Sequence, residues 1–231
     1  MKKIMDYRYL KILAVISMTV DHIGAILMPE AEVLRVIGRM AFPVFLFMII
    51  NSYKYTSDRY AFMKRIFILA VVSIVPYYLA FHRFYNIIFA FLGVLFTICI
   101  LDFLILEYKI YQKNNVLHLT LALFPLWYAL SVRDEYSYGW FAIGMGILIY
   151  YREELEFFPY AILSMTMVFA YGTFDQGGFV PLFLSLPIYW LLFELDKKLV
   201  YRRQTAFQKY FYYVYYPLHL LILVALKAVV S

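Results

Sequence analysis

Four ionisable side chains lie in two apolar stretches near the N-terminus. Asp21 and His22 are adjacent in the first stretch, and Arg35 and Arg39 lie four residues apart in the second. A histidine takes or gives a proton near neutral pH, and a nearby carboxylate raises its basicity. Residues four apart share one face of a helix, and Asp21 is an ion-pair partner for either arginine. The pattern indicates proton transfer at His22 or a polar packing contact between helices.

A second histidine, His219, lies in the last apolar stretch, two residues after Pro217. Proline lacks a backbone N–H, so we expect a kink there with room for a polar side chain. The spacing of the two histidines and Asp21 is not diagnostic of a metal site, and we expect no metal. The arginines have two interpretations: an ion pair that clamps the helices, or bidentate binding of a carboxylate or phosphate.

The composition places these residues in a membrane protein. Of 231 residues, 65% are hydrophobic and 16% are charged, with a mean hydropathy of +0.75. A soluble domain is nearer half apolar and a quarter charged. The sequence contains no Gly-rich phosphate loop and no G-x-S-x-G or HExxH motif of soluble enzymes. Cys99 is the only cysteine, so it has no partner for a disulfide within the chain. We therefore predict an all-α, polytopic integral membrane helical bundle, with residues 1–231 as a single domain.

Apolar runs of nearly spanning length set the expected number of helices. About 20 residues are needed to cross a bilayer squarely. Nine transmembrane helices are expected, with the sixth and seventh short; the runs are 10–28, 33–52, 61–81, 86–106, 116–132, 138–151, 157–172, 178–194 and 209–229.

The loop charges predict the orientation. If the N-terminus lies in the cytoplasm, sixteen of the 21 Lys and Arg residues fall in cytoplasmic segments and three outside, with Arg35 and Arg39 in the second run. Cationic loops stay on the cytoplasmic side. The sequence thus predicts an N-in, C-out protein of the cell membrane. The net charge of +6 follows from these loops, so it does not indicate a nucleic-acid partner.

Short motifs occur in order along nearly the whole chain. The more specific ones are Asp21-His22-Ile23-Gly24 and Gly38-Arg39-Met40-Ala41-Phe42-Pro43, and others are Val75-Pro76-Tyr77-Tyr78, Asn86-Ile87-Ile88-Phe89, Tyr138-Gly139-Trp140 and Tyr216-Pro217-Leu218-His219-Leu220. In these motifs the sequence resembles the TraX family. TraX proteins are associated with acetylation of the pilin N-terminus, but no feature of this sequence indicates conjugation, so the pilin substrate is not carried over.

The resemblance implies a membrane-embedded acyltransferase that moves an acetyl group from cytoplasmic acetyl-CoA, the donor substrate, to an amine or hydroxyl at or across the membrane. By analogy, His22 is the general base, supported by Asp21, with His219 as a second polar member of the catalytic site. Direct transfer and an acyl-histidine intermediate are both open. The residues expected to bind substrate or donor are Arg35, Arg39, Asn86, Trp140 and Tyr216.

The donor's phosphates are expected near a cytoplasmic basic cluster, although the positive-inside rule alone also accounts for its charge. The cluster consists of Lys54, Arg59, Lys64 and Arg65.

At five positions the sequence departs from the polar pattern expected of the family. These are Asn51 and Tyr55, in place of an acid and a histidine, and Ile74, Ala90 and Ser137. The departures imply a different substrate or reduced activity.

Two other functions fit the same residues. Intramembrane Asp, Arg and His side chains also form proton relays, as in a small proton-coupled transporter. The departures at polar positions favour a non-catalytic relative that acts as a membrane partner. The lipid bilayer is one expected partner. The acceptor is left open and is a peptide amine, a sugar, a lipid or a small amine. The sequence does not determine the oligomeric state.

Overall fold

The described part of the protein is a bundle of helices. The computed structural model describes residues 5–111, 139–154, 185–196, 199–200 and 205–230. Its helices are α1 (Tyr7–Ile26), α2 (Glu32–Arg39), α3 (Ala41–Lys54), α4 (Arg59–Val72), α5 (Ile74–Phe81), α6 (Ile87–Tyr111), α8 (Gly139–Tyr150), α11 (Ser185–Asp196) and α12 (Ala206–Val230). Within these residues, the strands are a parallel pair of two residues each, β1 (Met5–Asp6) and β2 (Leu199–Val200). The predicted all-α class is confirmed.

Four candidate membrane spans lie in the described residues, or up to five if one bent pair is a single span. They are Tyr7–Ile26, Glu32–Lys54, Ile87–Lys109, Tyr210–Val229 and the pair Arg59–Val72 with Ile74–Phe81. Helix α8 is apolar but shorter. The predicted runs 116–132 and 157–172 lie outside the described residues. The count of nine and the N-in, C-out orientation therefore stay predictions.

Prolines account for the two interrupted spans. Pro43 and Pro76 occupy the first turns of α3 and α5. A proline ring clashes with the carbonyl four residues earlier, so a continuous helix is disfavoured there, whereas the first turn of a new helix accepts proline. The chain accordingly breaks at Met40 and at Ser73, where α4 and α5 meet at 42°. Pro217, by contrast, lies inside the uninterrupted helix α12.

The break after α4 also explains the position of Asn86. Its Nδ2 donates to the carbonyl oxygen of Ala70 at 2.9 Å, and its Oδ1 accepts from the backbone N–H of Ile88 at 3.1 Å. One side chain thus satisfies a carbonyl of α4 and caps the start of α6. Asn86 thus has a structural role, and the substrate binding that the family resemblance implied for it stays a prediction.

Asn86→Ala is expected to destabilise the protein by about 2–4 kcal/mol, because a helix cap and a partner of a buried carbonyl are both lost. Asp58→Ala is the matched control. Asp58 is exposed and only caps α4, accepting from Ala61 N–H at 2.8 Å, so its loss costs about 1 kcal/mol. Unfolding in detergent micelles measures both. Equal losses for the two variants would contradict the double role of Asn86.

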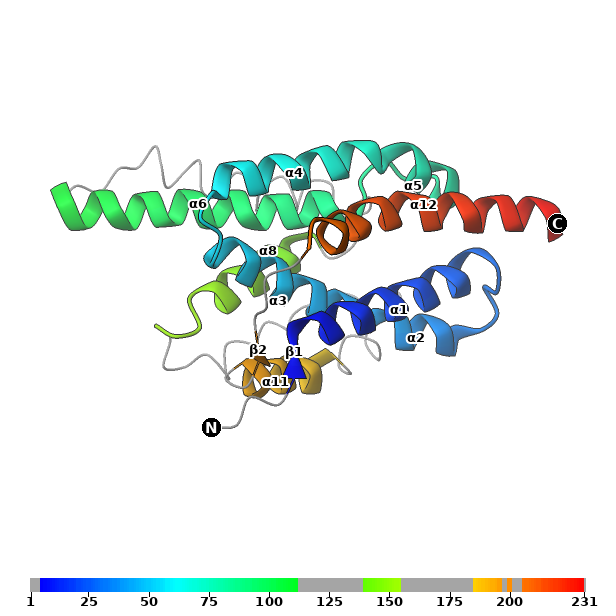
Figure 1. Ribbon diagram of the computed structural model, residues 1–231, viewed down its shortest axis with the longest axis horizontal. Helices are drawn as coiled ribbons and strands as arrows, with labels where there is room; N and C mark the ends of the chain where they lie inside the picture. The colour runs from blue at the N-terminus through cyan, green and yellow to red at the C-terminus, as the bar shows by residue number, and fades with distance from the viewer. Residues whose placement is uncertain (1–4, 112–138, 155–184, 197–198, 201–204, 231) are drawn as a thin grey trace.

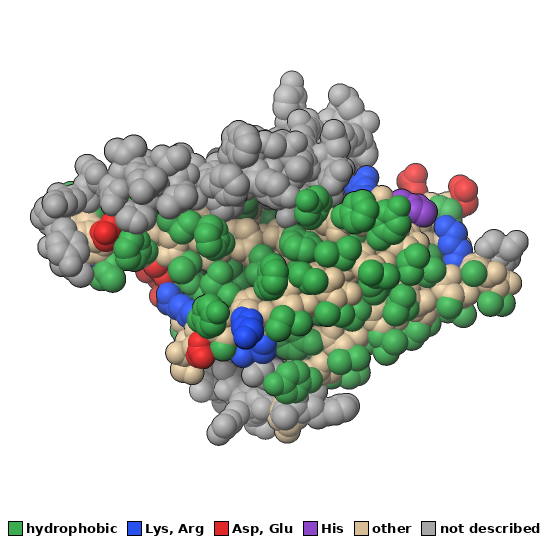
Figure 2. Space-filling view, turned by 90° about the horizontal axis from the view of Figure 1, so that it is seen from above, with side chains coloured by type: hydrophobic (Ala, Val, Ile, Leu, Met, Phe, Trp, Pro, Cys, Tyr) green, Lys and Arg blue, Asp and Glu red, His purple; other side chains and the backbone are tan. Residues whose placement is uncertain are grey.

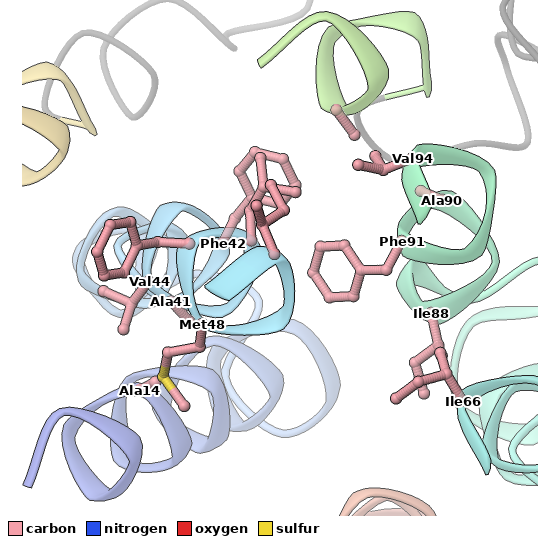
Figure 3. Close-up of a cluster of buried hydrophobic side chains, with 14 of the residues drawn as sticks. Ala14, Ala41, Phe42, Val44, Met48, Ile66, Ile88, Ala90, Phe91 and Val94 are labelled. Atoms are coloured by element: carbon pink, nitrogen blue, oxygen red, sulfur yellow. The ribbon is translucent and has the colours of Figure 1, made fainter. Parts of the chain in front are cut away.

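The core lies between α3 and its neighbours α1, α6 and α8. Phe42 of α3 packs against Phe91 of α6, with ring centroids 6.2 Å apart, and against Phe141 of α8 at 6.1 Å. Figure 3 shows Phe91 pointing towards α3, and Met48 of α3 pointing towards α1. Helix α3 is therefore the central element of this part of the core.

Many large apolar side chains point outward. Figure 2 shows a face on which hydrophobic side chains form a broad area, with charged side chains gathered towards its left and right ends. Exposed examples are Leu13, Phe67, Val75 and Leu218, each at least 48% exposed. An apolar band between charged ends is the surface that a bilayer requires. The protein is a membrane protein.

One end of the bundle is tied by charged contacts between helix termini. Arg59, at the start of α4, pairs with Asp102 of α6 at 2.8 Å. The Asp102 carboxylate also accepts from the hydroxyls of Tyr150 at 2.6 Å and Tyr151 at 2.9 Å. Lys54, at the end of α3, pairs with Glu153 at 3.3 Å. The terminus of α3, the start of α4 and the segment after α8 therefore lie on one side.

Candidate functional site

Helices α1 and α2 touch at glycines, which brings their charged residues together. A β-carbon added to Gly38 would lie 2.2 Å from Asp21 Cβ and 2.4 Å from Asp21 Cα. One added to Gly24 would lie 2.8 Å from Leu34 Cβ. Small residues permit such close helix packing in membranes. Since Gly38 precedes Arg39, the contact holds Asp21 beside the arginines of α2.

Asp21 forms the expected ion pair with Arg35. Arg35 Nη1 lies 2.8 Å from Asp21 Oδ2 and donates to the Asp21 backbone oxygen at 3.1 Å. Asp21 Oδ1 is buried and accepts no hydrogen bond from the described residues. The sequence-based prediction that Asp21 pairs with one of the two arginines is confirmed. The pair clamps α1 to α2 and leaves one carboxylate oxygen available.

The two histidines meet across the bundle. His22 Nδ1 lies 2.7 Å from His219 Nε2, and His219 Nδ1 lies 2.9 Å from the Tyr215 backbone oxygen. A carbonyl oxygen only accepts, so His219 Nδ1 carries a proton. Neutral His219 then accepts at Nε2, and His22 Nδ1 donates. Neutral His22 therefore has its lone pair on Nε2, the state that a general base requires.

Helix α12 presents three polar residues on one face. Tyr215 and Tyr216 precede His219 by four and three residues, so all three lie together on the helix. The Tyr215 and His219 rings are 5.1 Å apart and nearly parallel, and the Tyr216 ring lies 5.7 Å from that of His219. The Tyr215 hydroxyl lies 2.7 Å from Thr19 Oγ1 of α1. These contacts fix the orientation of His219 and, through it, that of His22.

A cavity of about 520 Å³ opens beside His22. We call it the arginine cavity, because three guanidinium groups and one carboxylate line it: Arg35, Arg39, Arg83 and Asp21. Its apolar wall includes Phe81 and Phe42. With neutral His22, the lining side chains carry a net positive charge, which suits a ligand that carries a carboxylate or phosphate.

A second cavity, of about 830 Å³, lies between α1, α3, α4, α6 and α12. We call it the tyrosine cavity, after Tyr7, Tyr55, Tyr210, Tyr212, Tyr213, Tyr215 and Tyr216 in its wall. Lys11 and Arg65 supply its positive charge. Lys11 Nζ lies 5.4 Å from the Tyr212 ring centroid and 5.5 Å from that of Tyr7. The size is in the range of cavities that hold cofactor-sized ligands.

The two cavities share a wall. Five residues line both of them, namely Met18, Phe45, Ile87, Phe91 and Tyr216. We call this shared wall the junction. The arginine cavity is lined from the ends of α1 and α5, the tyrosine cavity from the starts of α1 and α4, and both cavities from the start of α6. Figure 1 shows how these helices are arranged. Two ligands, one bound in each cavity, would meet at the junction.

The structure brings together most residues that the sequence singled out. Asp21, His22, Arg35 and Arg39 line the arginine cavity, and Tyr216 lines both cavities. His219 stands behind His22 as its hydrogen-bond partner. Asn86 has the structural role described above. The Trp140 side chain and Ser137 lie outside the described residues.

The predicted basic cluster is divided by the fold. Lys54 and Arg59 pair with Glu153 and Asp102, and Arg65 lines the tyrosine cavity. Lys11 is a further cavity residue that the sequence analysis treated only as a loop charge. Its position one turn into the first span was the available signal.

Arg83, in the segment between α5 and α6, also lines the arginine cavity. Among the described residues, no group of three or more His, Cys, Asp or Glu side chains is arranged to hold a metal ion.

Comparison with known proteins agrees with these motifs. The sequence model of the family described as TraX protein matches residues 7–227. The chain belongs to the TraX family. The match includes α1 to α6, α8, α11 and most of α12, so every residue of both cavities lies inside the TraX region.

A similar protein is the uncharacterized protein RP591 of Rickettsia prowazekii (strain Madrid E). It is 63% identical over 38 residues, which are 16% of this TraX-family chain and 15% of that protein. The match therefore spans a small part of the relative's length, and its name states no activity. No solved structure matches the chain.

Proposed function

We propose that this TraX-family protein is a membrane-embedded acyltransferase that moves an acetyl group from acetyl-CoA to an amine or hydroxyl acceptor. The observation that carries the proposal is the histidine pair: His219 holds His22, and His22 lines the arginine cavity, which shares the junction with the tyrosine cavity. The Nδ1–H of His22 is engaged by His219, so Nε2 is the nitrogen left with a lone pair. A base of this kind beside two adjoining cavities suits a reaction between two bound substrates.

The donor enters the tyrosine cavity from the cytoplasm in this proposal. The cavity lies towards the helix ends that carry Lys54 and Arg59, which the loop charges assign to the cytoplasmic side. Lys11 and Arg65 would meet the donor's phosphates. The apolar remainder of the wall suits the pantetheine arm, which would bring the thioester to the junction.

The acceptor occupies the arginine cavity. Its amine or hydroxyl forms a bond to the thioester carbonyl carbon while His22 Nε2 takes its proton. The carbon–sulfur bond then breaks, and the CoA sulfur takes that proton from His22, which returns to its neutral state. The His219 ring stabilises the positive charge that His22 carries between these two steps, because its Nε2 accepts from His22 Nδ1–H.

A direct test uses the protein in proteoliposomes with carbonyl-labelled acetyl-CoA on the Lys11 side and amines on the opposite side. Labelled product with the protein, and none with empty vesicles, is the expected result. Release of unlabelled CoA must match the product in amount. Intact acetyl-CoA after many hours with every acceptor would contradict the proposal.

The net charge of the arginine cavity predicts an acceptor with an anionic group. Phosphoethanolamine and ethanolamine differ only by the phosphate and form a matched pair. We expect kcat/KM to be about 10–100 fold higher for phosphoethanolamine, the value of one charge-assisted hydrogen bond. Arg39→Gln should remove most of this preference while it changes the ethanolamine rate little. Equal rates for the two amines in the wild type would contradict an anionic acceptor.

A proton-coupled transporter remains the second candidate, because the same two cavities adjoin a histidine pair and an Asp–Arg pair. Substrate-dependent proton flux without an acyl product would favour it.

The third candidate is a non-catalytic relative. Asn51 and Tyr55 stand in place of an expected acid and histidine, and both line the tyrosine cavity. Lack of acetyl-CoA binding by a folded protein would favour this candidate.

A further inference from the structure

We propose that the hydroxyl of Tyr216 donates the hydrogen bond that stabilises the carbonyl oxygen of the thioester during transfer. This inference rests on the proposed acyltransferase function. It names a group that forms a hydrogen bond with the reacting carbonyl of the substrate. It starts from a buried hydroxyl without a partner. Tyr216 is 7% exposed, and its hydroxyl makes no hydrogen bond to the described part of the chain.

A buried hydroxyl without a partner destabilises a folded protein, and most such groups are satisfied. Tyr215, the adjacent residue, shows the ordinary arrangement, since its hydroxyl meets Thr19 at 2.7 Å. We infer that the Tyr216 hydroxyl donates its hydrogen bond to an atom of a bound ligand.

The position of Tyr216 identifies that atom. Acetyl donor and acceptor can react only where the two cavities meet, so the thioester carbonyl must lie at the junction. Of the five junction residues, the other four are Met18, Phe45, Ile87 and Phe91, whose side chains hold no N–H or O–H donor. Among the described residues of the junction, Tyr216 is thus the one whose side chain can donate a hydrogen bond.

The position relative to the base is also suitable. Tyr216 lies on the same face of α12 as His219, and its ring is 5.7 Å from the ring of His219. His219 in turn holds His22 at 2.7 Å. The base therefore lines the arginine cavity and the Tyr216 hydroxyl group belongs to a residue of the junction, and helix α12 carries Tyr216 and holds His22 through His219. When the acceptor attacks, the carbonyl π electrons move to the oxygen, and a donor aimed at that oxygen lowers the barrier.

Tyr216→Phe removes only the hydroxyl oxygen. We expect kcat for acetyl transfer to fall about 10²–10³ fold, the usual loss when one oxyanion donor is removed. KM for acetyl-CoA should stay within about threefold of the wild-type value, because the hydrogen bond from the Tyr216 hydroxyl acts mainly on the transition state. The melting temperature should stay equal or rise, because an unpaired buried hydroxyl is lost.

Tyr53→Phe is the matched control. Tyr53 is also buried, at 1% exposure, but it lines neither cavity. Its kcat should equal that of the wild type.

A spectroscopic measurement tests the same contact without turnover. Acetonyldethio-CoA keeps the carbonyl of acetyl-CoA but has a methylene in place of the thioester sulfur, so it cannot transfer its acyl group. A hydrogen bond from Tyr216 should lower the infrared stretching frequency of its labelled carbonyl on binding. Tyr216→Phe should abolish this shift and retain binding.

The two proposals fail in different ways. An active wild type whose Tyr216→Phe variant keeps full kcat and the same infrared shift would overturn the role of Tyr216 and leave the acyltransferase function standing. A wild type without transfer would overturn both. A variant with a lowered melting temperature and unchanged infrared shift would show that the hydroxyl acts in folding instead.

Discussion

Replacement of His22 by alanine is expected to lower acetyl transfer by about 10²–10⁴ fold, the contribution of a positioned general base. The loss should appear in kcat, while acetyl-CoA binding measured by calorimetry stays close to that of the wild type. Binding is retained because the donor contacts lie in the tyrosine cavity, which His22 does not line. Single-turnover measurements with labelled acetyl-CoA give the rate of the chemical step.

His219 offers the matched comparison, because it acts on His22 and lines neither cavity. His219→Gln keeps a side-chain amide that can accept from His22 Nδ1–H, so it should retain more activity than His219→Ala. Equal transfer by the wild type and His22→Ala would exclude His22 as the base.

Gly38→Ala is expected to have the largest effect on structure. The added β-carbon would lie 2.2 Å from Asp21 Cβ and 2.4 Å from its Cα, and these are atoms of the helix itself, not the end of a flexible side chain. Helices α1 and α2 must separate, at a cost of about 1–3 kcal/mol or more. The shift also moves Asp21 and His22, and a displacement of about 1 Å can cost about 10²-fold in rate.

Gly93→Ala is the control for the general effect of alanine in a helix. Its added β-carbon would meet only Ile143 Cδ1, at 3.8 Å, an ordinary contact. Alanine favours helix over glycine by about 1 kcal/mol, so this variant should be as stable as the wild type or more stable. Melting temperatures in detergent and transfer rates compare the two variants. A Gly38→Ala protein that matches Gly93→Ala in both would show that the α1–α2 contact tolerates a larger residue.

Some of the candidate site could be predicted because it is local. Asp21 and Arg35 lie on consecutive helices joined by a short turn, so few arrangements keep them apart. A charge inside an apolar run needs a partner, and the nearest opposite charge is the natural one. The pairing at 2.8 Å agrees with this expectation. Position in the sequence was sufficient here because the connection itself restricts the geometry.

Other roles depended on the path of the backbone. The structural role of Asn86 is one example, because the break at Ser73 leaves the Ala70 carbonyl without a helical partner, and Asn86 supplies one at 2.9 Å. Lys11 and Arg83 each line a cavity, although the sequence analysis counted them only among the charges that set the orientation. These assignments follow from which helix ends meet, and no short stretch of sequence contains that information.

The sequence by itself determined that this is a membrane protein of helices, that it resembles the TraX family, and which residues are candidates for the site. Hydropathy and residue type are sufficient for these, because a bilayer requires long apolar helices and makes buried charges rare.

Only the tertiary structure decided how those residues combine. His22 and His219 lie 197 positions apart, and their contact fixes the tautomer of His22. In lipid both the buried and the exposed face of a helix are apolar, so hydrophobic periodicity does not show which faces meet. The packing of α1, α3, α6 and α12 creates the two cavities, their junction and the position of Tyr216 within it.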